Sequence, residues 1–412
     1  MRVVFFIIIS CFVSLNLWGQ RFFWEEGMLI ADSVEKSNYV NFSGGQFINS
    51  KTIDNQFVDA IFSGANITKE ILDNTSSRLV KANYIGSNTR FNVAYYQTLD
   101  KLNWGIKLNT RDFVNANITD DAFGLVFRGN RYKQGEELEL TNLNGNLYSY
   151  NQYGLNIEIP INDFVTVGSQ LSYLSCYAVV NTELSEGSLY TSSLGDSIKG
   201  NFTGELKYYL SDKHRLSPLN NSGIALDAYF YGHYNNLKYY LSFSDIGIIS
   251  DKNFSYYKID TTFTYTGIEL SSDLELDSVI GNNFIISDTL IQLPGVDKIS
   301  SNAPVILPFQ IKAAVQYKVT DNLRLQASLD YIVNANYSPR IGVVSNYQFN
   351  FPLQLELLAN YGGYSKLDVG LGMNYTFSKL FTAYFKTFYL EDLISPSKTS
   401  GQGNYFGIIV SW

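Results

Sequence analysis

The sequence predicts an all-β fold: a transmembrane antiparallel β-barrel of about 14–16 strands with short helical insertions. Two observations predict it. Apolar and polar residues alternate through one segment after another, most clearly over 366–377, and the connections between these segments alternate between tight turns and long polar loops. A period of two places the apolar residues of a strand on one face. Such strands, with short turns at one end and long loops at the other, are typical of outer-membrane barrels.

The chain begins with the pattern of an export signal. Arg2 precedes an apolar run from Val3 to Leu17, and Gly19 offers a small residue for cleavage. This run is short for a transmembrane helix. We therefore expect residues 1–19 to be a signal peptide and residues 20–412 to form a single outer-membrane barrel domain. Residues 8–11 resemble a lipobox, so a lipoprotein signal is the alternative.

Composition agrees with an envelope protein. The chain has 31 Tyr and 28 Phe, and tyrosine is typical of the aromatic girdles at a membrane interface. Cys176 is the one cysteine after the signal, which leaves no disulfide framework and no cysteine-based metal site. The net charge of −8 disfavours nucleic acid as a partner. We expect no cofactor and no bound metal.

The alternating pattern predicts sixteen strands. The first strand and the pair over 185–210 have the weakest pattern. In chain order the predicted strands span 39–48, 82–98, 102–115, 144–159, 164–180, 185–194, 197–210, 222–234, 237–248, 306–319, 323–335, 339–350, 353–362, 366–377, 380–390 and 402–412.

The connections alternate in length. Tight turns are expected at 99–101, 161–163, 235–236, 320–322, 351–352 and 378–379. Longer polar loops are expected at 116–143, 211–221, 249–305 and 391–401. Since outer-membrane barrels have short periplasmic turns and long outer loops, we expect 320–322 to be periplasmic and 249–305 to be a long outer loop.

Two segments depart from the strand pattern. Residues 49–81 form a predicted helical insertion or hatch, because Phe57, Ile61, Ile67 and Ile71 recur at helical spacing within it. Residues 119–128 begin with a cap-like Thr119 and predict another short helix. Each segment either folds inward as a hatch, lies over the outer mouth, or is an ordinary amphipathic loop helix.

Charged residues on the polar faces of the strands are predicted to point into the lumen. They are Lys107, Glu158, Glu205, Lys207, Asp227, Lys238, Lys312, Arg324, Asp330, Glu356 and Asp368. A wide ion-selective pore would favour one sign of charge. The near balance of signs indicates pairing across strands in a narrow or plugged lumen, with a polar path for a solute as the alternative.

The last strand carries a predicted assembly signal. Gly407, Val410 and the terminal Trp412 belong to an alternating segment that ends on an aromatic residue. This arrangement is similar to the terminal signal read by the barrel-assembly machinery, which we therefore expect as a partner beside the lipid of the outer membrane. The alternative is an ordinary amphipathic strand that happens to end the chain.

No catalytic pattern stands out. The chain has two histidines, His214 in a polar loop and His233 at a strand end. Asp227 shares a face with His233, but six residues of strand separate the two by about 20 Å. We expect a protein that is not an enzyme.

Three stretches carry a family resemblance. They are Asp121–Asn130 (DAFGLVFRGN), Val167–Leu174 (VGSQLSYL), and Ser222–Asp227 (SGIALD) running into Phe243–Ile249 (FSDIGII). With these stretches the sequence resembles a family of uncharacterised Bacteroidota outer-membrane barrels, a domain of unknown function. More distantly it is similar to the PorP/SprF barrels of type IX secretion, and by architecture to fatty-acid-transporter-like barrels.

Two classes of function follow as expectations. The first is a structural or accessory barrel of the outer membrane that docks secretion or surface partners, as the PorP/SprF resemblance implies. The alternative is a transporter or channel for a small or hydrophobic solute, for which the barrel size and the hatch-like segment 49–81 are the relevant features.

Overall fold

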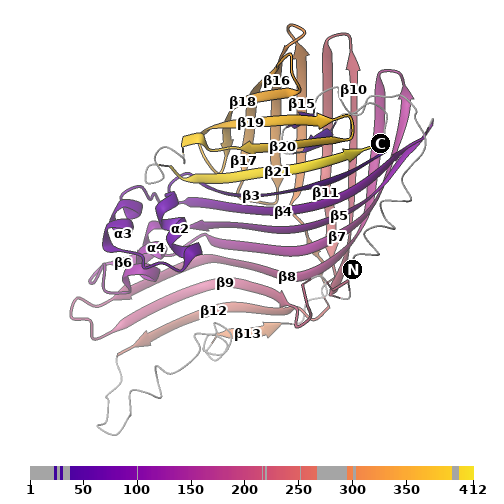
Figure 1. Ribbon diagram of the computed structural model, residues 1–412. Helices are drawn as coiled ribbons and strands as arrows, with labels where there is room; N and C mark the ends of the chain where they lie inside the picture. The colour runs from indigo at the N-terminus through magenta and orange to yellow at the C-terminus, as the bar shows by residue number, and fades with distance from the viewer. Residues whose placement is uncertain are drawn as a thin grey trace, which may run out of the picture.

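The computed structural model describes residues 23–25, 28–30, 38–99, 101–215, 217–218, 220–250, 252–266, 295–299, 303–391 and 399–412. The predicted signal peptide lies outside these residues. The chain forms a closed antiparallel barrel of 14 strands (Figure 1). In ring order the strands are β3 (Tyr39–Ser50), β4 (Asn83–Thr98), β5 (Asn103–Ile118), β7 (Leu143–Asn162), β8 (Val165–Thr191), β10 (Asn221–Tyr234), β11 (Leu237–Ile249), β15 (Phe309–Lys318), β16 (Leu323–Val333), β17 (Ser338–Gln348), β18 (Leu353–Gly363), β19 (Leu367–Ser378), β20 (Phe381–Thr387) and β21 (Gly401–Ser411). The ring closes where β21 pairs with β3.

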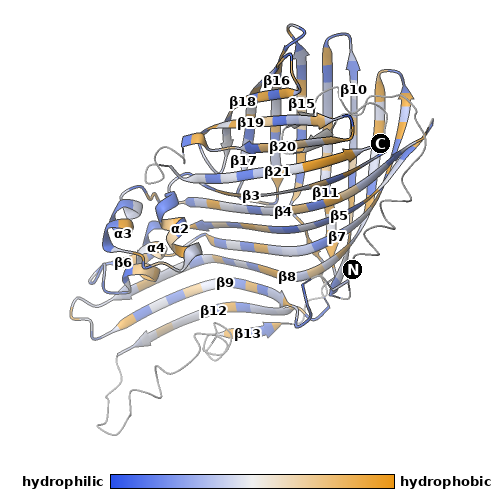
Figure 2. Ribbon diagram, in the orientation of Figure 1, coloured by the Kyte–Doolittle hydropathy of each residue, from blue (hydrophilic) through white to orange (hydrophobic). Residues whose placement is uncertain are grey.

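Alternation along each strand separates the two faces of the wall, as the hydropathy colouring shows (Figure 2). On β19, Leu371 and Met373 are exposed on the outside, whereas Asp368 and Asn374 are buried on the inside. Every ring strand exposes at least one large apolar side chain on its outer face. The predicted strand class and the direction of the two faces are confirmed.

Two ends of the barrel differ in their connections. The tight-turn end holds the short links 99–102, 163–164, 235–236, 319–322, 349–352 and 379–380. The long-loop end holds the longer links after β3, β5, β8, β11 and β20, and the short links 334–337 and 364–366. Asn235 adopts a positive φ of 52° in its two-residue turn, a conformation that asparagine tolerates better than most residues.

The predicted strands 185–194 and 197–210 do not cross the ring. Residues 185–191 are the distal part of the long strand β8, which pairs with β10 up to Cys176 and with β9 (Ile198–Leu210) from Ala178 onward. The polar run after Val180 resembles a turn in sequence, but it forms a β-bulge at Leu184–Glu186 and the strand continues. The ring therefore has 14 strands, the lower limit of the predicted range.

The distal part of β8 carries the same sheet beyond the ring, and this extension is here called the mouth sheet. It continues through β9, β12 (Ser255–Tyr265) and β13 (Val296–Ile299). The predicted loop 249–305 therefore contains strands, including β14 (Val305–Ile306), which pairs with β11. The short strand β6 (Glu137–Glu139) pairs with distal β8, and β1 (Phe23–Glu25) pairs with β2 (Met28–Ile30) as a separate hairpin.

Three short helices lie together beyond the ends of β3, β4 and β5 and form a helical cap (Figure 1). They are α2 (Asn55–Ser63), α3 (Lys69–Ser76) and α4 (Asp120–Arg128). Each has a side chain that caps its first turn, from Asp54, Thr68 and Thr119 respectively. The rings of Phe57, Phe123 and Phe127 meet with centroids 4.8–5.0 Å apart. Within the described residues no helix is long and apolar enough to cross a membrane.

Candidate functional site

The structure places most of the predicted lumen charges on ring strands. Lys107, Glu158, Asp227, Lys238, Lys312, Arg324, Asp330, Glu356 and Asp368 lie on β5, β7, β10, β11, β15, β16, β18 and β19. Glu205 and Lys207 lie instead on β9, outside the closed ring, so the prediction that they face the enclosed lumen is wrong. The physical reason is the bulge in β8, which lets that strand continue beyond the ring and places β9 outside the wall.

Several charged side chains inside the ring pair with a charge on another strand. Lys386 Nζ lies 3.3 Å from Glu356 Oε2, and both side chains are about 1% exposed. Arg340 lies 3.3 Å from Asp368, and Arg111 pairs with Asp245 with both side chains buried. Buried charges need such partners, because an unpaired ion in a low dielectric is costly. Sequence reasoning missed Arg111, Arg340, Lys386 and Asp245.

A β-bulge brings the Asp227 carboxylate against the backbone of Asp245 in the lumen. The register of the pairing between β10 and β11 shifts between Leu226 and Ala228. Asp245 adopts a positive φ of 63° at this point. Its backbone N–H donates to Asp227 Oδ1 over 2.7 Å. Gln170 Nε2 donates to Asp227 Oδ2 over 3.0 Å. The second and third of the stretches that carry the family resemblance therefore meet at this bulge.

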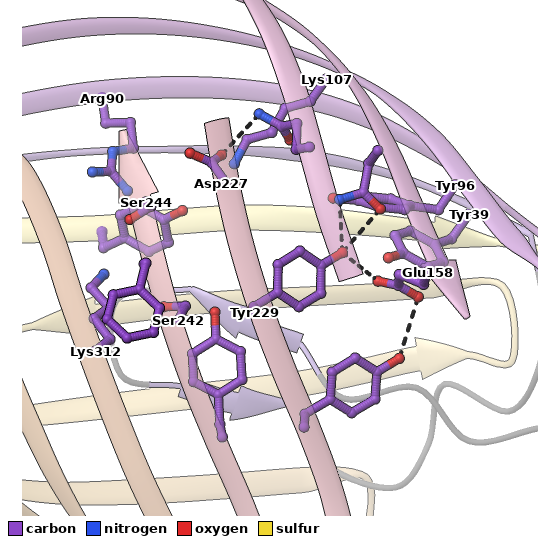
Figure 3. A pocket seen from close by; sticks show the side chains of 16 residues that line it. Tyr39, Arg90, Tyr96, Lys107, Glu158, Asp227, Tyr229, Ser242, Ser244 and Lys312 are labelled. Carbon is purple, nitrogen blue, oxygen red and sulfur yellow. Dashed lines mark hydrogen bonds between the residues drawn. The ribbon is translucent and has the colours of Figure 1, made fainter. Parts of the chain in front are cut away.

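A cavity of about 140 Å³ lies beside the bulge (Figure 3). Its wall includes a hydrogen-bonded cluster, in which Tyr229 donates to Glu158 over 2.8 Å and Tyr231 donates to the same carboxylate over 3.3 Å. Asn156 donates to the Tyr229 hydroxyl over 2.7 Å. Gly168 permits this approach, because a Cβ there would lie 2.3 Å from the Tyr229 ring. The other cationic and aromatic wall residues are Arg90, Lys107, Lys312, Tyr39, Tyr96, Tyr240, Phe243 and Tyr405.

Two smaller cavities continue from this central cavity toward the long-loop end. One of about 50 Å³ shares Lys312 with the central cavity. The next, of about 60 Å³, shares Asp330 and Arg340 with the previous one. Asp330 accepts from Gln310 (2.6 Å) and from Tyr337 (3.2 Å). The cavities thus form an interrupted row whose partitions are charged and polar side chains.

A larger pocket of about 560 Å³, the mouth pocket, opens between the ring and the mouth sheet. Six asparagines line it, together with Glu183, Glu205, Lys207 and Tyr256. A hydrogen bond with Glu205, and burial to a smaller extent, raises the pKa of the Tyr256 hydroxyl. Asn336 on its wall precedes Tyr337 of the neighbouring 60 Å³ cavity. Glu205 and Lys207 therefore face this pocket rather than the enclosed lumen.

An apolar cluster surrounds the lumen between the mouth pocket and the bulge. It contains Phe113, Tyr148, Tyr150, Leu174, Cys176, Val179, Tyr209, Ala225, Ile249, Val305, Leu307 and Ile332. These side chains come from several parts of the ring, including β5, β7, β8, β10, β11 and β16. The cluster is therefore an apolar part of the barrel interior, in contrast to the polar cavities.

The residues of the predicted assembly signal lie on the seam between β21 and β3. Val410 and Trp412 belong to the outward face, and Gly407 belongs to the inward face, where a Cβ would lie 2.3 Å from the Tyr384 ring. The Trp412 ring stacks on Tyr95 with centroids 6.3 Å apart. The three residues therefore lie where the ring closes, independently of any recognition by the assembly machinery.

The arrangement offers no constellation for catalysis in the part of the chain that is described. His233 packs edge-on against Phe164 at the tight-turn end, whereas Asp227 lies at the bulge in the middle of the same strand. Within the described ranges no group of three His, Cys, Asp or Glu side chains is placed to hold a metal ion.

Comparison with solved structures finds other barrels. They include a mutant of the TodX monoaromatic hydrocarbon channel (8% identity, TM-score 0.46, covering 91% of this chain and 90% of that chain). They also include the Ralstonia pickettii toluene transporter TbuX (8%, 0.44, 91% and 89%) and a Pseudomonas aeruginosa FadL homologue (9%, 0.45, 92% and 91%). A search among proteins with curated descriptions found no match.

A family model matches residues 36–386, which include all three stretches that carry the resemblance noted from the sequence. This match runs from just before β3 to the end of β20 and covers most of the barrel wall. The chain belongs to the family of unknown function DUF5723.

Proposed function

We propose that the protein is an outer-membrane barrel that passes a small polar solute through a gated lumen. The apolar outer face supports the membrane location, because every ring strand contributes exposed apolar side chains to it and a continuous apolar band of this kind is stable only against lipid or a partner. The row of cavities inside the ring is the observation that carries the transport proposal.

The solute is proposed to be polar because the cavities are lined by charges, amides and hydroxyls. An apolar molecule in these cavities would bury those groups without hydrogen-bond partners, at a cost of roughly 1–3 kcal/mol for each group left unpaired. A wide pore is disfavoured because the cavities in this row are small, at about 50–140 Å³. Passage therefore requires that some of the partitions between cavities move.

Arg340 is the proposed gate residue. It borders two successive cavities, pairs with Asp368 and lies with its guanidinium 5.8 Å from the Phe388 ring centroid. A side chain held by these contacts closes the lumen, and its displacement would join the two cavities.

Single-channel conductance in planar bilayers tests this proposal. The double variant Arg340→Ala/Asp368→Ala removes both charges together, so neither is left buried and unpaired, and it should increase conductance or open probability. The matched control is Arg215→Ala/Asp112→Ala, which removes a partly exposed pair at 2.6 Å. If neither the wild-type protein nor the gate variant conducts although both are correctly folded, the channel proposal is refuted.

The membrane orientation is tested separately. Epitope tags inserted at 320–322 and in the predicted outer loop 249–305 should be labelled on intact cells only at the second site. Labelling only at 320–322 would invert the proposed orientation. Fractionation of cells that express the untagged chain should recover it with the outer membrane.

A second candidate is the accessory barrel that the PorP/SprF resemblance suggests. The mouth sheet favours it, because this sheet stands outside the ring and exposes Leu194 and Leu210 at its margins. An envelope protein bound there would cover these side chains. Affinity purification from native membranes distinguishes the two: a silent barrel that repeatedly brings down one envelope protein would replace the channel proposal by this one.

A further inference from the structure

The mouth pocket carries a regular array of amides on neighbouring strands. Asn115 on β5 is in register with Asn146 on β7, and Asn146 is in register with Asn181 on β8. The row continues in register to Lys207 on β9 and Tyr256 on β12. Since neighbouring strands are about 4.8 Å apart, the pocket presents one polar side chain at each such interval.

A second row runs parallel to the first. Asn144 is in register with Glu183, and Glu183 is in register with Glu205. Asn334 and Asn336 enter the pocket from the link between β16 and β17 on another part of the ring. Amide side chains therefore line the pocket both from the sheet and from the link between β16 and β17.

Two of the three charged side chains that line the pocket are already engaged. Lys207 Nζ donates to the carbonyl of Ala303 over 2.7 Å and lies 5.3 Å from the Phe254 ring centroid. Glu205 accepts from the Tyr256 hydroxyl. The groups that remain available to a bound solute are mainly neutral amides. Each amide offers both a carbonyl acceptor and N–H donors.

Two buried amide atoms in the first row have no hydrogen-bond partner among the described residues. Among the described residues, none accepts a hydrogen bond from Asn115 Nδ2 and none donates to Asn181 Oδ1, although both atoms are buried. Asn115 uses its other end, since its Oδ1 accepts from Asn146 over 3.3 Å and from Asn336 over 3.4 Å. An unused buried polar atom costs roughly 1–3 kcal/mol, and these two provide one donor and one acceptor on either side of Asn146 in the row.

We infer that the mouth pocket binds a neutral polyhydroxylated solute, a short oligosaccharide. Vicinal hydroxyls are both donors and acceptors, so they match amides in register, and the exposed part of the Tyr256 ring offers a face for a sugar ring. The volume of about 560 Å³ lies in the range of small-molecule sites. The two carboxylates disfavour anions, and the amides disfavour apolar guests. This inference rests on the proposed function, for which it names the class of solute.

Isothermal titration of the purified full chain in detergent micelles tests the pocket. The probes are maltotriose, cellotriose and mannotriose, with sodium glutamate as the anionic comparison. At least one trisaccharide should bind saturably and glutamate should not. The variant Asn144→Ala/Asn181→Ala removes two amides and should weaken binding about tenfold or more, since each hydrogen bond contributes roughly 0.5–1.5 kcal/mol.

Asn74→Ala, on the exposed part of α3 at the same end of the barrel, is the matched control and should bind as the wild type does. Heat-modifiable electrophoretic mobility shows that each variant is folded. If no trisaccharide binds the folded wild type, or if the double variant binds equally well, the inference is overturned. Trisaccharide binding that needs the two asparagines, in a barrel that never conducts, would support the pocket and refute the channel. Conductance without any trisaccharide binding would do the reverse.

Discussion

The backbone N–H of Asp245 donates to the carboxylate of Asp227 across a bulge between β10 and β11, over 2.7 Å. The contact fixes both carboxylates on the inner face of the wall, and it needs a positive φ at Asp245. Aspartate is among the few residues besides glycine that accept this conformation readily. The bulge therefore depends on residue identity at two positions that are eighteen residues apart in sequence.

Asp245→Asn should destabilise the barrel. Asparagine tolerates the same backbone conformation but removes the charge that Arg111 pairs with, and the cost of breaking a buried pair is roughly 3–5 kcal/mol. Urea unfolding in lipid vesicles measures it. The comparison is Asp112→Asn, which breaks the partly exposed pair with Arg215 and should cost at most about 1 kcal/mol. Equal losses of unfolding free energy in the two variants would show that the buried pair contributes no more to stability than the partly exposed one.

Lys386 and Glu356 should show strong coupling in a double-mutant cycle. Lys386→Met leaves a buried carboxylate without its partner and should cost roughly 3–5 kcal/mol, while Lys386→Met/Glu356→Met should recover most of that loss. The same unfolding measurement applies. A double variant no more stable than the single one would contradict the assignment of the loss to the unpaired charge.

The helical cap should loosen in acid. Burial alone would raise the pKa of the Asp121 carboxyl, but hydrogen bonds from Lys133, the Glu139 N–H and Tyr132 hold that pKa below its usual value. A depressed folded pKa contributes stability that is complete above the unfolded value of about 3.9 and is lost as pH falls through the folded value. Hydrogen exchange of amides 120–139, corrected for the intrinsic effect of pH, should therefore accelerate in this window.

In Asp121→Asn the exchange should already be fast at neutral pH and should change little on acidification. A variant that keeps the wild-type profile would place the acid sensitivity elsewhere in the cap.

Trp412→Asp should lower the fraction of chain that reaches the closed barrel, because a charge would replace the ring that stacks on Tyr95 and stands on the outward face. Trp412→Phe keeps an aromatic ring and should assemble nearly as the wild type. Heat-modifiable mobility of membrane fractions gives the folded fraction. Full assembly of the aspartate variant would remove Trp412 from the predicted assembly signal.

Much of the ring could be predicted from the sequence because the period of two persists through each strand. The predicted strand 366–377 and the observed β19 (Leu367–Ser378) differ by one residue. The same period holds Arg111 on the face of Lys107, so that arginine was open to prediction. Lys386 was harder, because β20 has only seven residues and its alternation is brief.

The rest depends on contacts that local pattern does not encode. The register shifts at Leu184–Glu186 and at Leu226–Ala228 depend on how neighbouring strands pair, so the mouth sheet and the contact between Asp227 and Asp245 escaped prediction. The mouth pocket joins residues from β5, β8, β9 and the link after β16, and nothing in the sequence brings these segments together. Which charge pairs with which across the ring is likewise set by the closed fold.

The seam between the first and last ring strands is fastened at both ends. At the tight-turn end, the Trp412 N–H donates to the carbonyl of Asn38 over 2.9 Å. At the long-loop end, Asn55 at the start of α2 donates to Thr399 and to the carbonyl of Gly401, over 3.0 and 2.8 Å. These contacts join positions more than three hundred residues apart. The helical cap can therefore take its final position only after the last strand has joined the ring. A probe that binds the folded cap would report that the barrel has closed.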